Sequence, residues 1–293
     1  MFGSHLSIAG GMHNALLEAE SLKLDCVQVF TKNQQQWKAP PLQADAVAQW
    51  KSELSRLGWA GQPRVTSHAS YLINMGSPDD ALREQSIALM REEIERCETL
   101  DIPLLVFHPG AHTTAPREQG IARIADACAR LLRETPGYRT VLCLENVAGA
   151  GSHIGRTFEE LADLRARIAG RGAAAERVGF CIDTCHAHAA GYDLSTPELA
   201  RAALDQLDDA LGITSVRCMH LNDSKGAAGS RLDRHEHIGK GTIGKRKGGG
   251  FPAFLQHPHL RGVPKVLETP KGENARGVAH DTLNVRRLRA MMA

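Results

Sequence analysis

The sequence contains little of what marks a membrane or secreted protein. No apolar run approaches the roughly 18 residues that a membrane-spanning helix needs, and the longest near the middle of the chain covers only residues 102–107. The N-terminus lacks a basic segment followed by an apolar one, so we expect no signal peptide. Seven scattered cysteines include no C-x-x-C pair, which argues against a disulfide framework or a zinc ribbon. These absences favour a cytoplasmic protein with buried, reduced thiols.

The net charge of the chain is also small. A formal charge of +2 at pH 7 provides no overall basic field that would hold nucleic acid, so any basic patch must be local. The 293 residues are 42% hydrophobic and 23% charged, which is the balance of a soluble globular protein with a sizeable core. Because no linker-like shift in composition divides the chain, we predict a single domain over residues 1–293.

Short β-rich runs recur along the chain and alternate with helical patterns. The runs begin near residues 3, 26, 64, 104, 141, 178, 216 and 263. Residues 44–57 and 79–100 carry apolar side chains at helical spacing, Thr157 with Glu160 predicts a capping box, and Thr196 predicts an N-cap followed by proline. Eight strands alternating with helices favour an α/β fold of the (β/α)8 TIM-barrel type over a doubly wound sheet, which usually has fewer strands.

Six consecutive predicted strands end in a residue type that binds metals. These residues are His68, His108, Glu145, Asp183, His220 and Glu268. The C-terminal ends of barrel strands are where barrel enzymes carry their active sites. Three further candidates lie close in sequence, because His186 follows Asp183 by three residues and Asp233 with His235 forms a D-x-H motif. A packed histidine is the ordinary interpretation of any one position, but it explains six strand ends in a row poorly.

Nine candidate ligands are too many for one ion. Zinc takes three or four protein ligands, and a catalytic zinc keeps one position open for water. Nine ligands with one shared carboxylate fit three zinc ions, whose charge outweighs that of the four carboxylates. Such a centre attracts an anion, and paired metals stabilise both the attacking and the leaving oxygen of a phosphodiester displacement. The residues therefore predict a multinuclear zinc site that acts on a phosphate ester.

An irregular segment, residues 222–250, follows the seventh predicted strand. It contains seven basic and three acidic residues, a net charge of +4, which leaves −2 for the rest of the chain. A segment of this length after a barrel strand is unusual, and the Asp and His residues within it predict a functional role rather than a loose insertion. We interpret the glycines of its GKGTIG stretch as a source of flexibility.

Seven stretches of the chain resemble the endonuclease IV family. They are FTKNQQQW (30–37), HASYLINMG (68–76), FHPGAH (107–112), LENVAGAGSHIG (144–155), CIDTCHAHAAGYD (181–193), MHLNDSKGAAGSRLDRHEHIGKGTIG (219–244) and LET (267–269). The resemblance runs essentially from end to end. It implies a (β/α)8 barrel with a trinuclear zinc site that acts on double-stranded DNA containing abasic sites, and we expect the protein to be a monomer.

The resemblance also assigns the nine ligands to three zinc ions (Zn2+). It implies a first ion on His68, His108 and Glu145. It implies that Glu145 bridges to a second ion, which is also held by Asp183, His220 and Glu268. It implies a third ion on His186, Asp233 and His235. Glu145 and Glu268 are the expected catalytic carboxylates.

The reaction that the resemblance implies is hydrolysis of the phosphodiester on the 5′ side of an abasic site. The products would carry a 3′-hydroxyl and a 5′-deoxyribose phosphate, and the enzyme would also remove blocking groups from 3′ ends. Tyr71 and Leu72 match residues that enter the DNA helix, although by themselves they fit an ordinary loop over the core. Gln35 stands where a member of the family has arginine, and Ala69 replaces an aspartate. The basic segment, including Lys245, Arg246 and Lys247, is expected to contact DNA phosphates.

Two other classes of protein remain as alternatives. A metal-dependent sugar isomerase or epimerase with a TIM barrel also gathers His, Glu and Asp at strand ends, but needs only one or two metals. A DNA-binding protein without enzymatic activity needs phosphate contacts alone, which would leave nine ligand residues unexplained. The number of metal ions per chain separates the three interpretations.

Overall fold

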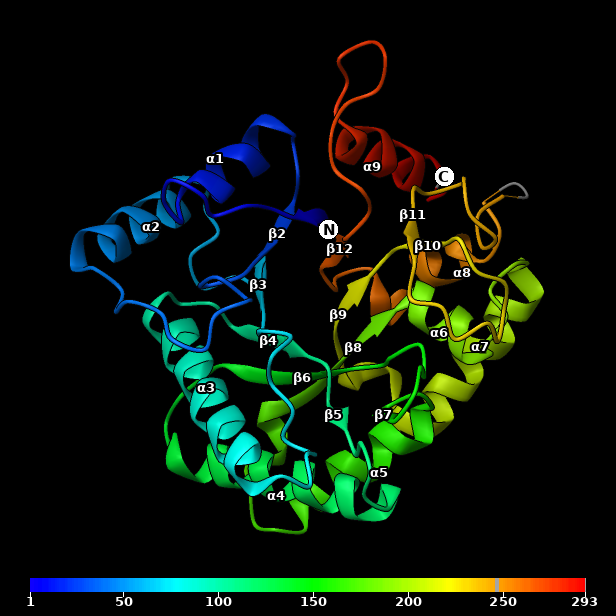
Figure 1. The fold of residues 1–293 in the computed structure, drawn as a ribbon. Coiled ribbons are helices and arrows are strands. Elements are labelled where there is room, and N and C mark those ends of the chain that lie inside the picture. Colours follow the sequence, from blue (N-terminus) through cyan, green and yellow to red (C-terminus); the bar gives the residue numbers. More distant parts are fainter. Residues whose placement is uncertain (246–247, 293) are drawn as a thin grey trace.

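Parallel strands close into a barrel at the centre of the computed structural model, which describes residues 1–245 and 248–292 (Figure 1). The strands of the barrel are β1 (Phe2–His5), β2 (Cys26–Val29), β3 (Val65–His68), β4 (Leu104–Phe107), β6 (Val141–Glu145), β8 (Val178–Asp183), β9 (Val216–His220) and β12 (Lys265–Leu267). They follow one another around the barrel in chain order, and β12 pairs with β1 to close it. The predicted (β/α)8 TIM barrel is therefore confirmed, with a strand at each predicted position.

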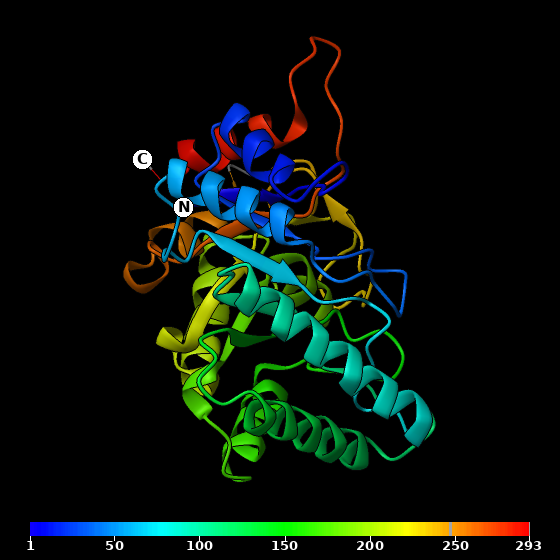
Figure 2. The same ribbon diagram turned by 90° about the vertical axis from the view of Figure 1, so that its left-hand side faces the viewer.

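Helices surround the barrel on the outside (Figure 1). They are α1 (Asn14–Ser21), α2 (Ala44–Arg56), α3 (Asp80–Thr99), α4 (Arg117–Glu134), α5 (Phe158–Ala169), α6 (Thr184–Ala190), α7 (Pro197–Leu211), α8 (Phe251–Gln256) and α9 (His280–Ala290). Helices α2 and α3 agree with the predicted ranges to within one residue at each end. The segment between β12 and α9 extends away from the barrel in both ribbon views (Figures 1 and 2).

Two helices begin at the N-caps that the sequence predicts. The Thr157 hydroxyl accepts a hydrogen bond from the Glu160 N–H at 3.3 Å, and Thr196 caps α7 with Pro197 at the first helical position. The capping box at Thr157 is incomplete, because the Glu160 carboxylate instead accepts from the N–H groups of Gly155 and Arg156 at 3.1 and 2.9 Å. It thereby satisfies donors that lie just outside the helix.

Two groups of buried apolar side chains stabilise the barrel. The larger group lies between the strands and the surrounding helices. The smaller consists of Leu104, Val106, Cys143, Cys181, Cys218 and Val266. These six residues come from five strands of the barrel, alternate along β4 with the helix-facing Leu105, and fill the barrel interior. All seven cysteines are buried, as the sequence predicts.

Residues 222–245 and 248–250 are arranged around a short hairpin and a buried carboxylate. Strand β10 (Asp223–Ser224) pairs antiparallel with β11 (His235–Glu236). The Asp223 carboxylate accepts hydrogen bonds from Gly239, Gly241 and Gly244 at 2.9 to 3.1 Å. A Cβ atom on Gly241 would lie 2.3 Å from the Ser224 carbonyl oxygen. The interpretation of these glycines as flexible is therefore wrong, because they allow the chain to approach Asp223 closely.

A second short antiparallel pair, β5 (Gly110–Ala111) with β7 (His153–Ile154), joins the segments that follow β4 and β6. Within residues 1–245 and 248–292, no helix is both long enough and apolar enough to cross a membrane. Of the predicted basic DNA contacts, Lys245 is exposed, while Arg246 and Lys247 lie outside the described residues.

Candidate metal centre

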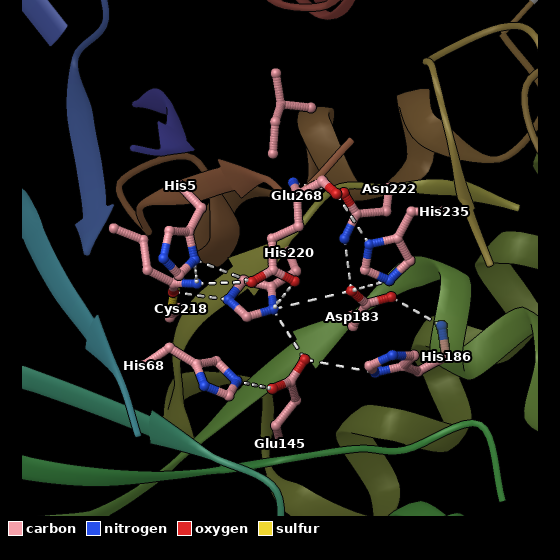
Figure 3. Close-up of polar contacts among 12 residues, drawn as sticks. His5, His68, Glu145, Asp183, His186, Cys218, His220, Asn222, His235 and Glu268 are labelled. Carbon is pink, nitrogen blue, oxygen red and sulfur yellow. Dashed lines mark hydrogen bonds and ion pairs between the residues drawn. The ribbon is translucent and has the colours of Figure 1, made fainter. Parts of the chain in front are cut away.

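The nine predicted ligand residues lie together at the C-terminal end of the barrel. Figure 3 shows all of them except His108 and Asp233 as labelled side chains. Four of them are the last residues of strands, namely His68 of β3, Glu145 of β6, Asp183 of β8 and His220 of β9. His108 and Glu268 directly follow β4 and β12, His186 lies in the first turn of α6, and Asp233 and His235 lie at β11. Parallel strands carry their C-terminal ends to one face of the barrel, which brings together residues far apart in sequence.

The first group of ligands is His68, His108 and Glu145. The Glu145 Oε2 atom lies 3.1 Å from His68 Nε2 and 3.3 Å from His108 Nε2. His68 Nδ1 lies 2.7 Å from the Ala69 carbonyl oxygen, to which it donates its proton, so that the Nε2 lone pair faces Glu145. Two imidazoles and a carboxylate converging in this way form a suitable set of zinc ligands.

The second group shares Glu145 with the first and adds Asp183, His220 and Glu268. His220 Nδ1 lies 2.8 Å from Glu145 Oε1 and 3.2 Å from Glu268 Oε2. Asn222 donates to Asp183 Oδ2 at 2.7 Å, and its Oδ1 accepts from the Glu268 N–H at 2.8 Å (Figure 3). Each oxygen of Glu145 faces a different group of ligands, Oε2 the first group and Oε1 the second. This carboxylate is therefore placed to bridge two ions.

The third group is His186, Asp233 and His235. Asp233 Oδ1 lies 3.3 Å from His186 Nε2 and 3.4 Å from His235 Nε2. The Nδ1 atoms of the two imidazoles donate to the carbonyl oxygens of Asn146 and Glu268, at 2.9 and 3.2 Å. Both Nε2 atoms are buried and make no hydrogen bond to any described residue. Buried imidazole nitrogens that lack a partner fit a metal ion at this position.

Opposing charges shift the pKa values of the ligands strongly. Burial alone would raise the pKa of Glu145, but His220 and His108 outweigh it and hold that pKa well below its usual range. Burial would lower the pKa of His220, whereas Glu268 and Glu145 raise it well above its usual range. The pKa of Asp233 falls to about 2, against the effect of burial, because the neighbouring His186 and His235 imidazoles favour its charged form. Glu145 and Asp233 therefore stay ionised and make the centre attractive to cations.

Thiols lie near the same ligands, a feature that the sequence analysis did not identify. Cys181 and Cys218 have ligand atoms within 4.8 Å of each other and of His220, and Cys185 lies similarly close to Asp183 and His235. Both nitrogens of His220 are already directed elsewhere, Nδ1 to Glu145 and Nε2 to Gln28. The geometry therefore favours the nitrogen and oxygen ligands.

Gln28 on β2 is a site residue that the sequence analysis missed. Its buried Oε1 atom lies 2.9 Å from His220 Nε2 and accepts from the Thr66 hydroxyl at 3.1 Å. Its Nε2 atom donates to Glu268 Oε1 at 2.8 Å. This orientation makes His220 Nε2 a donor, so the lone pair lies on Nδ1, which faces the carboxylates. The available signal was a glutamine within the otherwise apolar strand CVQVF.

We expect Gln28→Leu to weaken metal binding at the second group. The variant removes the acceptor that sets the His220 tautomer and the donor that holds Glu268, and loss of such a partner costs roughly 10- to 100-fold in metal affinity. The measurement is the rate at which a chelator withdraws metal from the folded protein. Ser67→Ala is the control, because Ser67 follows Thr66 on β3 and its buried side chain faces the opposite side of the strand. Equal release rates for the two variants would show that Gln28 does not hold the ligands.

The residues predicted to recognise DNA lie on two neighbouring loops, which we call the β2 loop (residues 30–43) and the β3 loop (residues 69–79). Tyr71 is 58% exposed, and its ring centre lies 5.2 Å from that of His68 and 5.8 Å from that of His108. Leu72 is half-buried and packs against the core, and Gln35 is exposed. The assignment of these residues to DNA binding stays a prediction; of the three, Tyr71 and Gln35 are exposed.

A cavity of about 210 Å³ opens beside the first group of ligands. Its walls include Tyr71 and Asn74 of the β3 loop, His108, and His153 of β7. The metal centre is therefore reached from the side of the β3 loop. Ala69, which follows the ligand His68, is buried and does not line this cavity.

Comparison with solved structures gives two likenesses that differ in extent. Endonuclease IV from Thermus thermophilus matches with a TM-score of 0.83 at 36% identity, over 99% of this chain and 98% of that one. A D-tagatose 3-epimerase-like protein matches with a TM-score of 0.73 at 17% identity, over 99% of this chain and 96% of that one. The second likeness concerns the fold alone.

Comparison of sequences identifies the family to which the chain belongs. A family described as a xylose isomerase-like TIM barrel matches residues 16–289. A probable endonuclease 4 from Chloroflexus aurantiacus is 45% identical over 291 residues, covering 99% of this chain and 98% of the relative. A probable endonuclease 4 from Geobacter sulfurreducens is 41% identical over 294 residues, covering 99% and 94%. The chain therefore belongs to the endonuclease IV family of xylose isomerase-like TIM barrels.

Proposed function

We propose that the protein is a zinc-dependent DNA-repair endonuclease that hydrolyses the phosphodiester on the 5′ side of abasic sites in double-stranded DNA. The products are a 3′-hydroxyl and a 5′-deoxyribose phosphate, and the same centre removes blocking groups from 3′ ends. Membership of the endonuclease IV family supports the substrate class. We further propose that residues 1–293 act as a single domain and as a monomer.

The observation that carries this proposal is the sharing of Glu145 between two groups of ligands. Glu145 Oε2 faces His68 and His108, while its Oε1 faces His220. With the separate group of His186, Asp233 and His235, the residues fit three zinc ions. A sugar isomerase needs no such third group, and the likeness to epimerases is limited to the fold.

Bound divalent ions would activate a water molecule and stabilise the attacking and leaving oxygens of the displacement. The protein contributes position and charge. Glu145 and Glu268, which we propose as catalytic carboxylates, are held ionised among histidines. Asn222 orients Asp183, and the carbonyl of Asn146 orients His186. Three divalent cations outweigh the four carboxylates, so the loaded centre attracts the DNA phosphate.

Selectivity for abasic sites follows from the cost of extruding a nucleotide. An abasic nucleotide has no base to stack or pair, so moving it toward the metal centre costs less free energy than flipping a normal nucleotide. Tyr71 lies exposed between the solvent and the ligands His68 and His108. An aromatic side chain at this position is suited to fill the gap left in the base stack.

The direct test uses a duplex with one abasic analogue, labelled on either strand, followed by mapping of the cut. We expect cleavage of the phosphodiester on the 5′ side of the analogue, and no cleavage of the matched intact duplex. The metal content is counted on the same sample by mass spectrometry under native conditions. About three ions per chain agree with the nuclease, one or two with an isomerase, and none with a binding protein. An uncut abasic duplex in the presence of a fully loaded protein would refute the proposal.

We expect Tyr71→Ala and Leu72→Ala to have different effects. Tyr71→Ala should raise the KM for abasic duplex by about tenfold with little change in kcat, because stacking on a base is worth ~1–3 kcal/mol. Leu72 packs against the core, so Leu72→Ala should mainly lower the free energy of unfolding, by about 1–2 kcal/mol for a half-buried side chain. Steady-state kinetics and thermal unfolding measure the two effects. An unchanged KM in Tyr71→Ala would remove this residue from recognition.

A substitution of the exposed Gln35 is expected to strengthen DNA binding. Gln35→Arg adds a positive charge on the β2 loop and should tighten binding to abasic duplex, with a steeper dependence on salt. Binding is measured by fluorescence anisotropy at several salt concentrations. The control is Gln43→Arg at the far end of the same loop, where Gln43 is the N-cap of α2. Equal gains in the two variants would indicate general attraction to DNA and no contact specific to position 35.

A further inference from the structure

One carboxylate on α3 is buried away from the metal centre. The α3 segment REEIER is highly charged, yet Glu93 is only 1% exposed. Its two carboxylate oxygens contact different loops. Oε2 accepts from the Thr31 hydroxyl at 2.9 Å, and Oε1 accepts from the Ser70 N–H at 3.3 Å. Glu93 therefore connects the β2 loop to the β3 loop through the helix that packs behind them.

Ser70 extends this connection toward the residues proposed to bind DNA. Its hydroxyl donates to the Gln34 carbonyl oxygen at 2.6 Å and accepts from the Leu72 N–H at 3.3 Å. Gln34 directly precedes Gln35, and Ser70 directly precedes Tyr71. A continuous set of hydrogen bonds thus runs from Glu93 to the backbone beside both exposed side chains.

Arg96, one helical turn after Glu93, holds the β2 loop at Thr31 as well and at one further point, Pro40. Its Nε atom donates to the Thr31 hydroxyl at 3.2 Å and its Nη2 atom to the Thr31 carbonyl oxygen. Its Nη1 atom donates to the Pro40 carbonyl oxygen at 3.2 Å. Both ends of the segment that carries Gln35 are therefore held on α3.

Burying a carboxylate is costly, which argues that this one has a specific role. Burial raises the pKa of Glu93, although the Thr31 hydroxyl, the nearby Lys32 and the Ser70 N–H act in the opposite direction. A leucine at this position would pack between the helix and the loops without that cost. A buried charge that is satisfied by hydrogen bonds stabilises one arrangement of its partners over others.

We propose that Glu93 is a positioning residue for abasic-site recognition, because it holds the β2 and β3 loops in one fixed arrangement. This inference rests on the proposed function, which places Gln35 and Tyr71 against the DNA. Loops that are fixed before binding lose less conformational entropy when the DNA arrives. The hydrogen bonds of the Glu93 carboxylate go to Thr31 and Ser70 and to none of the nine ligand residues. Replacing Glu93 should therefore weaken the binding of DNA and leave the rate of the chemical step unchanged.

Glu93→Ala should therefore raise the KM for abasic duplex about tenfold while kcat stays within about twofold, since one interaction of ~1.4 kcal/mol corresponds to a tenfold change. The dissociation constant for abasic duplex, measured by anisotropy with the cleavage-deficient Glu145→Gln protein as background, should rise by the same factor. The dissociation constant for the matched intact duplex should not change. Metal content should equal that of the wild type.

Two variants serve as controls. Glu93→Gln keeps an acceptor for the Ser70 N–H and a group that can donate to the Thr31 hydroxyl, so it should restore most of the lost affinity. Glu95→Ala removes the same charge from an exposed position of the same helix and should leave KM unchanged. Thermal unfolding of every variant reports any general loss of stability.

The outcomes separate positioning from structure and from the proposed function. A lower unfolding temperature in Glu93→Ala, with KM and the preference for abasic over intact duplex unchanged, would overturn the inference and leave a purely structural residue. An equal loss of affinity for both duplexes would overturn it as well. If the unmodified protein does not prefer abasic duplex, the proposed function itself fails, whatever the variants show.

Discussion

Replacing Glu145 with glutamine is expected to reduce cleavage of abasic duplex by more than a thousandfold, equivalent to about 4 kcal/mol of transition-state stabilisation. Glu145 has both oxygens engaged, one toward His68 and His108 and the other toward His220. Glutamine has the same shape but supplies neither the charge nor the second oxygen that bridging two ions requires. Single-turnover cleavage with enzyme in excess over DNA measures the effect on the chemical step.

The fold must persist for this result to be informative. Glu145 is completely buried, so circular dichroism and thermal unfolding accompany the kinetics. Glu273→Gln, at an exposed position in the segment between β12 and α9, makes the same chemical change away from the site and should cleave normally. If the Glu145 variant does not fold, Asp233→Asn probes the third group from a half-exposed position and should also lose most activity. A folded Glu145→Gln protein with more than a tenth of the wild-type rate would exclude the bridging role.

Removal of metal is expected to abolish cleavage altogether and to lower the unfolding temperature. A ligand that binds only the folded state stabilises it by RT ln(1 + [L]/Kd), so tightly held ions contribute several kcal/mol. Without them, four carboxylates and five histidines remain crowded together at the end of the barrel, where His186 and His220, whose pKa values are raised, would hold protons in place of metal. Dialysis against a chelator, followed by metal analysis and calorimetry, measures both effects.

Restoration distinguishes metal removal from damage to the protein. Addition of zinc to the stripped protein should return activity and unfolding temperature together, with about three ions regained per chain. Magnesium should not replace zinc well, because five of the nine ligand side chains are imidazoles, which suit transition metals. Full activity in protein that retains less than a tenth of an ion per chain would refute a metal-dependent reaction.

The barrel and the nine ligand positions could be predicted because they follow from periodicity and topology. Six of the eight barrel strands are short runs that end in a ligand residue or are directly followed by one, and parallel strands carry these ends to one face. His68 and Glu268 lie 200 residues apart in the chain, yet both belong to the same face. His68 is the last residue of one barrel strand, and Glu268 directly follows another. The residue type then limits the chemistry that the face can perform.

The supporting residues were harder to predict, because their partners are set by packing. Gln28 could be noticed as a polar residue in an apolar strand, but its bond to His220 depends on how β2 and β9 face each other across the barrel. Glu93 lies among four charged neighbours in REEIER, and only its place on the buried stripe of α3, with Met90 and Cys97, distinguishes it. The sequence patterns identify ligands at strand ends more readily than the groups behind them.

Tertiary structure bears on two interpretations. Leu72 was grouped with Tyr71 as a DNA contact; it is partly buried against the core, and its contact with DNA stays a prediction. The glycines of GKGTIG are required by the buried Asp223, whose oxygens gather their N–H groups. A carboxylate 16 residues away from Gly239 could not be connected to it without the folded chain.

The closure of the barrel by β12 has a consequence for the synthesis of the protein. The first group of ligands comes from β3, β4 and β6, all of which have been synthesised when half of the chain is made. The second group needs Glu268, which follows the strand that pairs with both β9 and β1. A nascent chain can therefore offer the first ion a site early, but the bridged pair of ions can assemble only after translation has passed β12. Uptake of the second ion would mark the moment at which a newly made molecule becomes complete.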